Sequence, residues 1–228
     1  MFRIICLLIG YGFGLLQTSY IMGRLNGIDI REHGSKNAGF TNTNRVLGMK
    51  KGAVVFIIDV AKAAIAFTVA TVLYNATYDG ALAGGTFFET NYILPGLYAG
   101  LGVVLGHCFP FYLGFKGGKG VASTLGLILM LDWRIAIITF AVGIIIVAVT
   151  KFISVASLTM SALVPILMYI FITLDGGAPH RLIPPLMPLE GVWLTAALCA
   201  FIWFLHRDNI KRLCKKEENK FSFRRKPE

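Results

Sequence analysis

The chain has 228 residues, of which 56% are hydrophobic and only 15% are charged, whereas soluble domains usually carry about 25% charged residues. It has 22 Lys and Arg against 12 Asp and Glu, which gives a net charge of +10. These values exclude a disordered chain, a basic nucleic-acid-binding domain and almost any soluble enzyme. They predict a single polytopic membrane domain over residues 1–228.

Six apolar segments follow one another along the chain, and each is long enough to predict a membrane span. They cover residues 4–23, 52–74, 92–115, 134–150, 152–174 and 189–205. The first lacks the cleavage site of a signal peptide, so we expect it to be retained. A seventh segment, 121–131, has only eleven residues, and its length alone favours a buried or re-entrant piece. The segments 75–91 and 175–190 have the Gly, Pro, Thr and Asn content of extracytoplasmic loops.

The distribution of Lys and Arg decides whether residues 121–131 cross the membrane. If they cross, the loops on one side hold 18 of these residues and the loops on the other side hold 3. If they do not, the division is 10 against 11. Cytoplasmic loops carry an excess of Lys and Arg, which favours the asymmetric division. We therefore expect an all-α membrane protein, a seven-transmembrane-helix bundle with the N-terminus outside and the C-terminal tail, 206–228, in the cytoplasm.

A polar segment follows the first span and is suited to binding phosphate. Its glycines permit tight turns that aim backbone N–H groups inward, and its hydroxyl, amide and guanidinium groups are phosphate donors. The candidate binding residues are Gly34, Ser35, Asn37, Gly39, Thr41, Asn42 and Arg45. The alternative is an ordinary polar turn whose positive charge marks the cytoplasmic side.

A second candidate segment joins the third span to residues 121–131. Its members are His107 and, after a short interval, Lys116, Gly117, Gly118, Lys119 and Gly120. A glycine-rich loop that opens a helix directs backbone N–H groups and the positive end of the helix dipole at an anion. The spacing is not that of a Walker A loop. A flexible loop with cytoplasmic lysines is the alternative, and His107 taken alone is more often a packed histidine.

Three smaller groups complete the candidates. Asp59 and Lys62 lie at positions i and i+3 within a span, where they can pair or contact a substrate. Ser154 and Ser157 lie one helical turn apart at the start of another span, although such hydroxyls often bond to their own backbone. The last group follows the final span and comprises His206, Asn209 and Arg212, which also suit anchoring to lipid head groups. The seven-span topology brings all of these groups to or near one membrane face, which indicates a single phosphate-binding site between helices facing the cytoplasm.

These motifs resemble those of the bacterial acyl-phosphate:glycerol-3-phosphate acyltransferase family, PlsY. The segments that carry the resemblance are 34–45, 106–122, 154–157 and 206–213, together with the Asp59–Lys62 pair. Two positions depart from the family pattern, because Lys36 replaces a Gly and Phe40 replaces an Ala. Lys36 either adds a phosphate contact or points to solvent.

The resemblance implies that an acyl phosphate donates its acyl group to the sn-1 hydroxyl of glycerol 3-phosphate, giving lysophosphatidic acid and phosphate. The implied location is the bacterial plasma (inner) membrane, and the implied partners are the two substrates and membrane lipid. We expect no cofactor, metal, nucleic acid or obligate protein partner. A small transporter of an organic phosphate is the main alternative, and a non-catalytic lipid-binding protein is a third.

No His in the chain is followed five residues later by an Asp, so a His general base oriented by such an Asp is absent. We therefore expect the mechanism to rest on positioning of the substrates and stabilisation of charge. The expected catalytic residues are Ser35, Arg45, His107, Lys116 and His206. Ser35, Arg45, Lys116 and Ser154 would hold the acyl phosphate, whereas His206, Asn209 and Lys119 would hold glycerol 3-phosphate. The proton passes to a substrate phosphate or to His107, and a Ser35 acyl-enzyme is a second route. Asp59 and Lys62 are expected to support the site.

Overall fold

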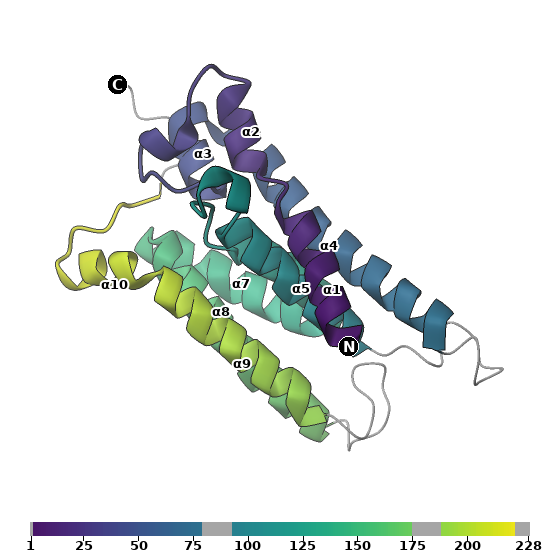
Figure 1. The fold of residues 1–228 in the computed structure, drawn as a ribbon. Helices are drawn as coiled ribbons and strands as arrows, with labels where there is room; N and C mark the ends of the chain where they lie inside the picture. The colour runs from purple at the N-terminus through teal and green to yellow at the C-terminus, as the bar shows by residue number, and fades with distance from the viewer. Residues whose placement is uncertain (1, 79–92, 175–187, 222–228) are drawn as a thin grey trace.

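The computed structural model describes residues 2–78, 93–174 and 188–221. Figure 1 shows the long helices running alongside one another, with the short helices α2, α3 and α10 near one end of the bundle. The helices are α1 (Phe2–Gly14), α2 (Thr18–Arg24), α3 (Phe40–Leu47), α4 (Met49–Tyr78), α5 (Ile93–Cys108), α6 (Val121–Leu131), α7 (Trp133–Thr150), α8 (Ile153–Leu174), α9 (Pro188–Leu205) and α10 (Arg207–Cys214). Two single turns of 3₁₀ helix, Ile30–Glu32 and Phe111–Leu113, lie in the connections.

The prediction of an all-α membrane bundle is confirmed, although the exact number of spans is not fixed by the helices. Within the described residues, five helical segments are long and apolar enough to cross a membrane, or six if α9 and α10, which meet at a 58° bend, form one span. The eleven-residue α6 is the segment whose length left its crossing open. At 1.5 Å per residue it is about 16 Å long, against a hydrocarbon core of about 30 Å.

Four helix boundaries differ from the sequence-based prediction. The segment 4–23 is divided into α1 and α2 by a break at residues 15–17. The helix within 92–115 ends at Cys108, because Pro110 disfavours helical backbone just before it. Helix α4 continues to Tyr78 and α9 begins at Pro188, so the ends of the expected loops 75–91 and 175–190 are helical, and the remainder lies outside the described residues.

Glycines allow α1 and α5 to pack backbone against backbone. A Cβ added to Gly10 would lie 1.8 Å from the carbonyl oxygen of Ala99, and one added to Gly102 would lie 2.1 Å from that of Leu7. Small residues at four-residue spacing are the usual device for such close contact between membrane helices. This contact fixes the end of α5, and thereby His107, against the break between α1 and α2.

The largest buried cluster joins α4, α5, α6 and α9 in the middle of the bundle. Its members are Phe67, Leu97, Val104, Cys108, Leu127, Leu131, Leu198 and Ile202. Many large apolar side chains lie on the outside instead: Ile57, Ile145 and Trp193 are each more than 60% exposed. Such a surface would be unfavourable in water and suits contact with lipid chains.

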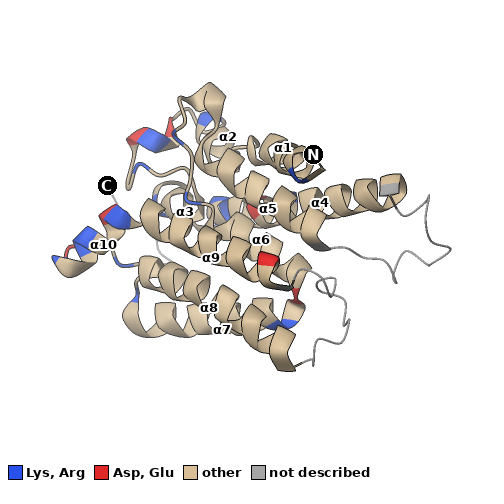
Figure 2. Cartoon of the chain, turned by 60° about the horizontal axis from the view of Figure 1, so that its bottom comes forward, with Lys and Arg blue, Asp and Glu red and all other residues tan. Residues whose placement is uncertain are grey.

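Charged side chains are unevenly distributed along the bundle. Figure 2 shows most of the Lys, Arg, Asp and Glu residues gathered at the end that carries α3 and α10. At this end the C-terminal segment turns back from α10 towards α3 (Figure 1), where the backbone N–H of Phe221 donates to the carbonyl of Lys151 at 2.7 Å. The side chain of Phe221 also packs against that of Phe40, with ring centroids 6.2 Å apart.

Candidate active site

The loop before α3 is held together by the side chain of Asn42. Its Oδ1 accepts from the backbone N–H of Ser35 at 2.8 Å, and its Nδ2 donates to the carbonyls of Ile30 and His33, each at 3.0 Å. Gly34 has a φ of +58°, and a Cβ there would lie 2.4 Å from Asn42 Oδ1. Asn42 and Gly34 therefore shape the loop, which leaves Ser35 exposed at its tip.

Helix α3 carries Arg45 into the charged end of the bundle. Gly39 is the N-cap of this helix, and Thr43 hydrogen-bonds through its hydroxyl to Ser19 of α2 at 2.7 Å. Arg45 is half-buried, and burial lowers its pKa, while the nearby Glu218 opposes the shift. A guanidinium stays protonated in proteins, so Arg45 contributes a partly desolvated positive charge.

The glycine loop, residues 116–120, doubles back onto the end of α5. The backbone N–H of Gly117 donates to the carbonyl of Cys108 at 3.1 Å, and that of Gly118 donates to the carbonyl of His107 at 3.0 Å. Gly120 is the N-cap of α6 and has a φ of +75°. The predicted loop that opens a helix is therefore present, and Lys119 turns from it to donate to Oδ1 of Asn209 on α10.

The carboxylate of Glu218 lies at the centre of the predicted binding residues. Its Oε1 accepts from Ser154 Oγ at 3.1 Å and from Asn209 Nδ2 at 2.7 Å, and its Oε2 accepts from Arg212 Nε at 2.8 Å. The Glu218 side chain is only 6% exposed. A buried carboxylate needs such partners, and the same set of donors suits a phosphate oxygen.

Two titratable groups that feel the charge of Glu218, namely Lys119 and His206, have lowered pKa values. Burial, with the adjacent charge of Arg212, lowers the pKa of Lys119 to about 8. Burial, with the charge of Lys119, lowers the pKa of His206 to about 4, so this imidazole is neutral at pH 7. Its Nδ1–H donates to the carbonyl of Ile202 at 2.8 Å, because a carbonyl can only accept. Nε2 is then the unprotonated nitrogen, an acceptor for a hydroxyl group.

Asp59 and Lys62 form the pair that their spacing predicts, with 2.7 Å between Oδ1 and Nζ and almost complete burial. Lys62 Nζ also donates to Nδ1 of His107 at 2.9 Å, and Thr18 Oγ1 donates to Asp59 at 3.2 Å. His107, which the sequence marks as a candidate catalytic residue, is therefore held inside the bundle beneath the glycine loop.

The described contacts gather six of the predicted site residues into one cluster. Arg45, Lys119, Ser154, His206, Asn209 and Arg212 surround Glu218 or its immediate partners. Ser35 and Lys116 are exposed, and Ser157 Oγ donates to the carbonyl of Ile153 within its own helix at 2.9 Å. Sequence reasoning missed Glu218 itself, because a glutamate in a charged tail gives no signal that it is buried. Within the described residues, no three His, Cys, Asp or Glu side chains gather in a metal-binding arrangement.

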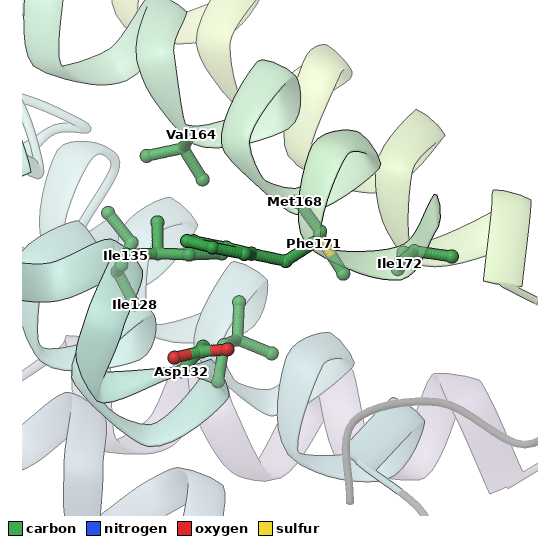
Figure 3. A pocket seen from close by; sticks show the side chains of 8 residues that line it. Ile128, Asp132, Ile135, Val164, Met168, Phe171 and Ile172 are labelled. Atoms are coloured by element: carbon green, nitrogen blue, oxygen red, sulfur yellow. The ribbon is translucent and has the colours of Figure 1, made fainter. Parts of the chain in front are cut away.

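A pocket between α6, α7 and α8 lies away from this site (Figure 3). It is lined by the C-terminal end of α6, whereas the glycine loop precedes the N-terminal end of that helix. Its lining is apolar except for Asp132, whose carboxylate pairs with Arg134 at 2.7 Å. The pocket offers no phosphate-binding groups, so it is not the candidate site.

Comparison with known proteins establishes the family of the chain. A family model described as glycerol-3-phosphate acyltransferase matches residues 4–216. The chain belongs to this family. It is 35% identical to a glycerol-3-phosphate acyltransferase of Mycoplasmopsis agalactiae, over 96% of this chain and 93% of that protein. It is 36% identical to one of Shouchella clausii, over 93% of each chain.

Two solved structures share the fold of this chain. Both are crystal structures of PlsY, an integral membrane glycerol 3-phosphate acyltransferase. The glycerol 3-phosphate form has a TM-score of 0.75 at 29% identity and covers 96% of each chain. The lysophosphatidic acid form has a TM-score of 0.73 at 28% identity and covers 97% of this chain and 96% of that one. The predicted family and enzyme class are thereby confirmed, and the transporter alternative is not favoured.

Proposed function

We propose that this acyltransferase moves a fatty acyl group from an acyl phosphate to the sn-1 hydroxyl of glycerol 3-phosphate. The products are lysophosphatidic acid and inorganic phosphate. The observation that carries the proposal is the convergence of Arg45, Lys119 and Arg212 on one buried carboxylate, with Ser154 and Asn209 bonded to it. Both substrates carry a phosphate, and these are charge-assisted phosphate donors from four separate segments of the chain.

The two phosphates are assigned to neighbouring parts of the cluster. Lys119 and Asn209, which bond to each other, hold glycerol 3-phosphate together with His206. Arg45 and Ser154 hold the acyl phosphate, and the exposed Ser35 and Lys116 close over it from their loops. The desolvated charges stabilise the developing negative charge of the departing phosphate more strongly than they would in water.

The hydroxyl proton goes to the departing phosphate in this proposal. The sn-1 oxygen attacks the acyl carbon, the bond from that carbon to the phosphate oxygen breaks, and phosphate leaves carrying the proton. His206 Nε2 accepts a hydrogen bond from the hydroxyl and orients it. With a pKa of about 4, His206 is a weaker base than a phosphate group, whose second pKa is about 6. The substrate phosphate is therefore the favoured proton acceptor.

Direct transfer is favoured over a covalent Ser35 intermediate. A serine nucleophile needs an adjacent base within hydrogen-bond reach. Among the described residues, Ser35 hydrogen-bonds through its backbone N–H to Asn42, and no base is bonded to its hydroxyl. A burst of phosphate from acyl phosphate alone would support the covalent route, and its absence supports direct transfer.

The enzyme is proposed to lie in the bacterial inner membrane with seven spans, including α6, with the N-terminus outside and the site in the cytoplasm. The support is the gathering of charge at the end that carries α3 and α10 (Figure 2), together with the excess of Lys and Arg in the loops of that side. The ends of the eleven-residue α6 are proposed to stay buried in protein, since backbone groups cannot remain unpaired in lipid.

The test is phosphate release by the purified protein in lipid mesophase with acyl phosphate and glycerol 3-phosphate. Wild type is expected to release phosphate only when both substrates are present. Arg45→Ala and Lys116→Ala are each expected to lower kcat/KM by about 100-fold, because a lost charged contact is worth about 3 kcal/mol. Lys215→Ala, at an exposed position beyond α10, is the matched charge control. A folded variant with near-full activity would remove that residue from the site.

A further inference from the structure

We propose that Lys62 and His107 are positioning residues that hold the glycine loop, and thereby Lys119, in place without touching either substrate. The inference rests on the proposed function and assigns a role to a buried cluster that the transfer step does not use. The cluster extends from the break between α1 and α2, through α4, to the end of α5.

All three protons of the Lys62 ammonium group have acceptors. They are Asp59 Oδ1 at 2.7 Å, the carbonyl of Leu16 at 2.9 Å and His107 Nδ1 at 2.9 Å. An ammonium group has three donors and no acceptor, so Lys62 is fully used inside the protein. It has no proton left for a substrate, and its exposed fraction is about 2%.

The bond from Lys62 fixes the tautomer of His107. An ammonium group can only donate, so Nδ1 is the acceptor and the ring proton lies on Nε2. Asp59 lies on the same side, with Oδ1 3.7 Å from Nδ1. The imidazole is thus oriented by two charged groups of α4, with its Nε2 edge turned towards the glycine loop.

Gly118 packs between His107 and the loop that precedes α3. A Cβ on Gly118 would lie 2.1 Å from His107 Nε2 and 2.6 Å from the carbonyl oxygen of Ala38. The Gly118 backbone also donates to the carbonyl of His107 at 3.0 Å. Gly118 therefore packs directly against the imidazole of His107. Lys119 is the next residue along the chain, so its position depends on this contact.

Gln17, in the break between α1 and α2, holds the end of α5 that carries His107. Its side-chain amide donates to the carbonyls of Gly106 at 3.2 Å and His107 at 3.0 Å. The backbone of His107 is therefore held from the break between α1 and α2, while its ring is held from α4. Both edges of the His107 ring face protein groups, and the residue is only 4% exposed. The arrangement therefore argues against proton transfer between His107 and a substrate.

A buried ion pair is weak evidence for stability, and this permits a sharp test. Replacing both members by apolar residues of similar volume is often neutral or stabilising, whereas removing one member leaves an unpaired buried charge. The informative variant is therefore the double substitution Asp59→Leu with Lys62→Met. If the pair only stabilises the fold, a folded double variant keeps wild-type kinetics.

For a positioning role we expect the double variant to keep its Tm within a few degrees. Its kcat/KM for glycerol 3-phosphate should fall 10- to 100-fold, mostly through KM, because a misplacement of about 1 Å can cost about 100-fold. Wild-type kinetics in the folded double variant would overturn the proposal. The activity of wild type with both substrates tests the proposed function separately, so the two failures are distinguishable.

Two further variants examine the contact from each side. His107→Asn is expected to lower kcat/KM without changing the shape of its pH profile, and loss of one limb of the profile would instead make His107 a proton carrier.

Gly118→Ala is expected to raise the KM for glycerol 3-phosphate at least tenfold. Gly12→Ala, where an added Cβ has no neighbour within 4 Å, is the matched control. Equal kinetics for the two alanine variants would contradict the positioning role.

Discussion

Glu218 Oε1 accepts a hydrogen bond of 2.7 Å from the side-chain amide of Asn209. The two lie nine positions apart in the chain, and the tail must turn back over α10 to bring them together. Ser154 and Arg212 bond to the same carboxylate, so one anion satisfies three proposed substrate-binding side chains. This relationship leads to a prediction about how the site responds to an external anion.

Glu218→Ala is expected to lower stability by about 1–3 kcal/mol, because it removes hydrogen bonds to a charged group. It also removes the counter-charge that Glu218 gives to Arg212, Lys119 and Arg45. Inorganic phosphate should therefore raise the Tm of Glu218→Ala more than that of wild type. Glu217→Ala, at the exposed neighbouring position, is the control. Equal phosphate shifts in all three proteins would argue against an anion site here.

The activity is expected to decline above pH 8 through Lys119. Its pKa of about 8 means that the ammonium form, which binds phosphate, is present below this pH and lost above it. Since kcat/KM reports the free enzyme, the kcat/KM for glycerol 3-phosphate should fall above pH 8. The substrate phosphate is already dianionic there. Arginine stays charged in this range, so the decline in kcat/KM above pH 8 should disappear in Lys119→Arg. If that variant showed a decline with the same midpoint, Lys119 would be excluded as the group that causes it.

Lys36 stands where the family pattern has a Gly, and it either contacts a substrate phosphate or points to solvent. The substitution Lys36→Gly distinguishes these two roles. Lys36 has a φ of +60° and an exposed side chain. The left-handed conformation costs an L-residue about 1–2 kcal/mol, and the greater entropy loss of Gly offsets about 0.5–1 kcal/mol of that gain. We expect a Tm that is unchanged or higher and activity within twofold of wild type. A clear rise in KM would show instead that Lys36 contacts a substrate.

Cys214 offers a natural test of the proposed orientation. It is exposed on α10, whereas Cys6 and Cys108 are buried and Cys199 is partly buried. A membrane-impermeant maleimide added to intact cells should leave Cys214 unlabelled, and permeabilised cells should show labelling that Cys214→Ser abolishes. Labelling in intact cells would place α10, and the site with it, outside.

Local sequence patterns predict the parts of the site whose geometry is local. The long helices follow from hydropathy, and the Asp59–Lys62 pair follows from its i, i+3 spacing. The break at residues 15–17 carries no Pro or charge to signal it. It is stabilised by Gln17 and Lys62, whose partners are distant in the chain. The burial of Glu218 likewise depends on tertiary contacts, and a charged tail otherwise indicates a solvated segment.

Separate loops of the chain are proposed to form one cluster that binds the phosphate groups of the substrates. A structure of the protein with glycerol 3-phosphate bound, determined in lipid, tests it most directly. We predict that the substrate phosphate lies within hydrogen-bond distance of at least two of Lys119, Asn209 and Arg212. A bound phosphate that contacts none of the three would contradict the account.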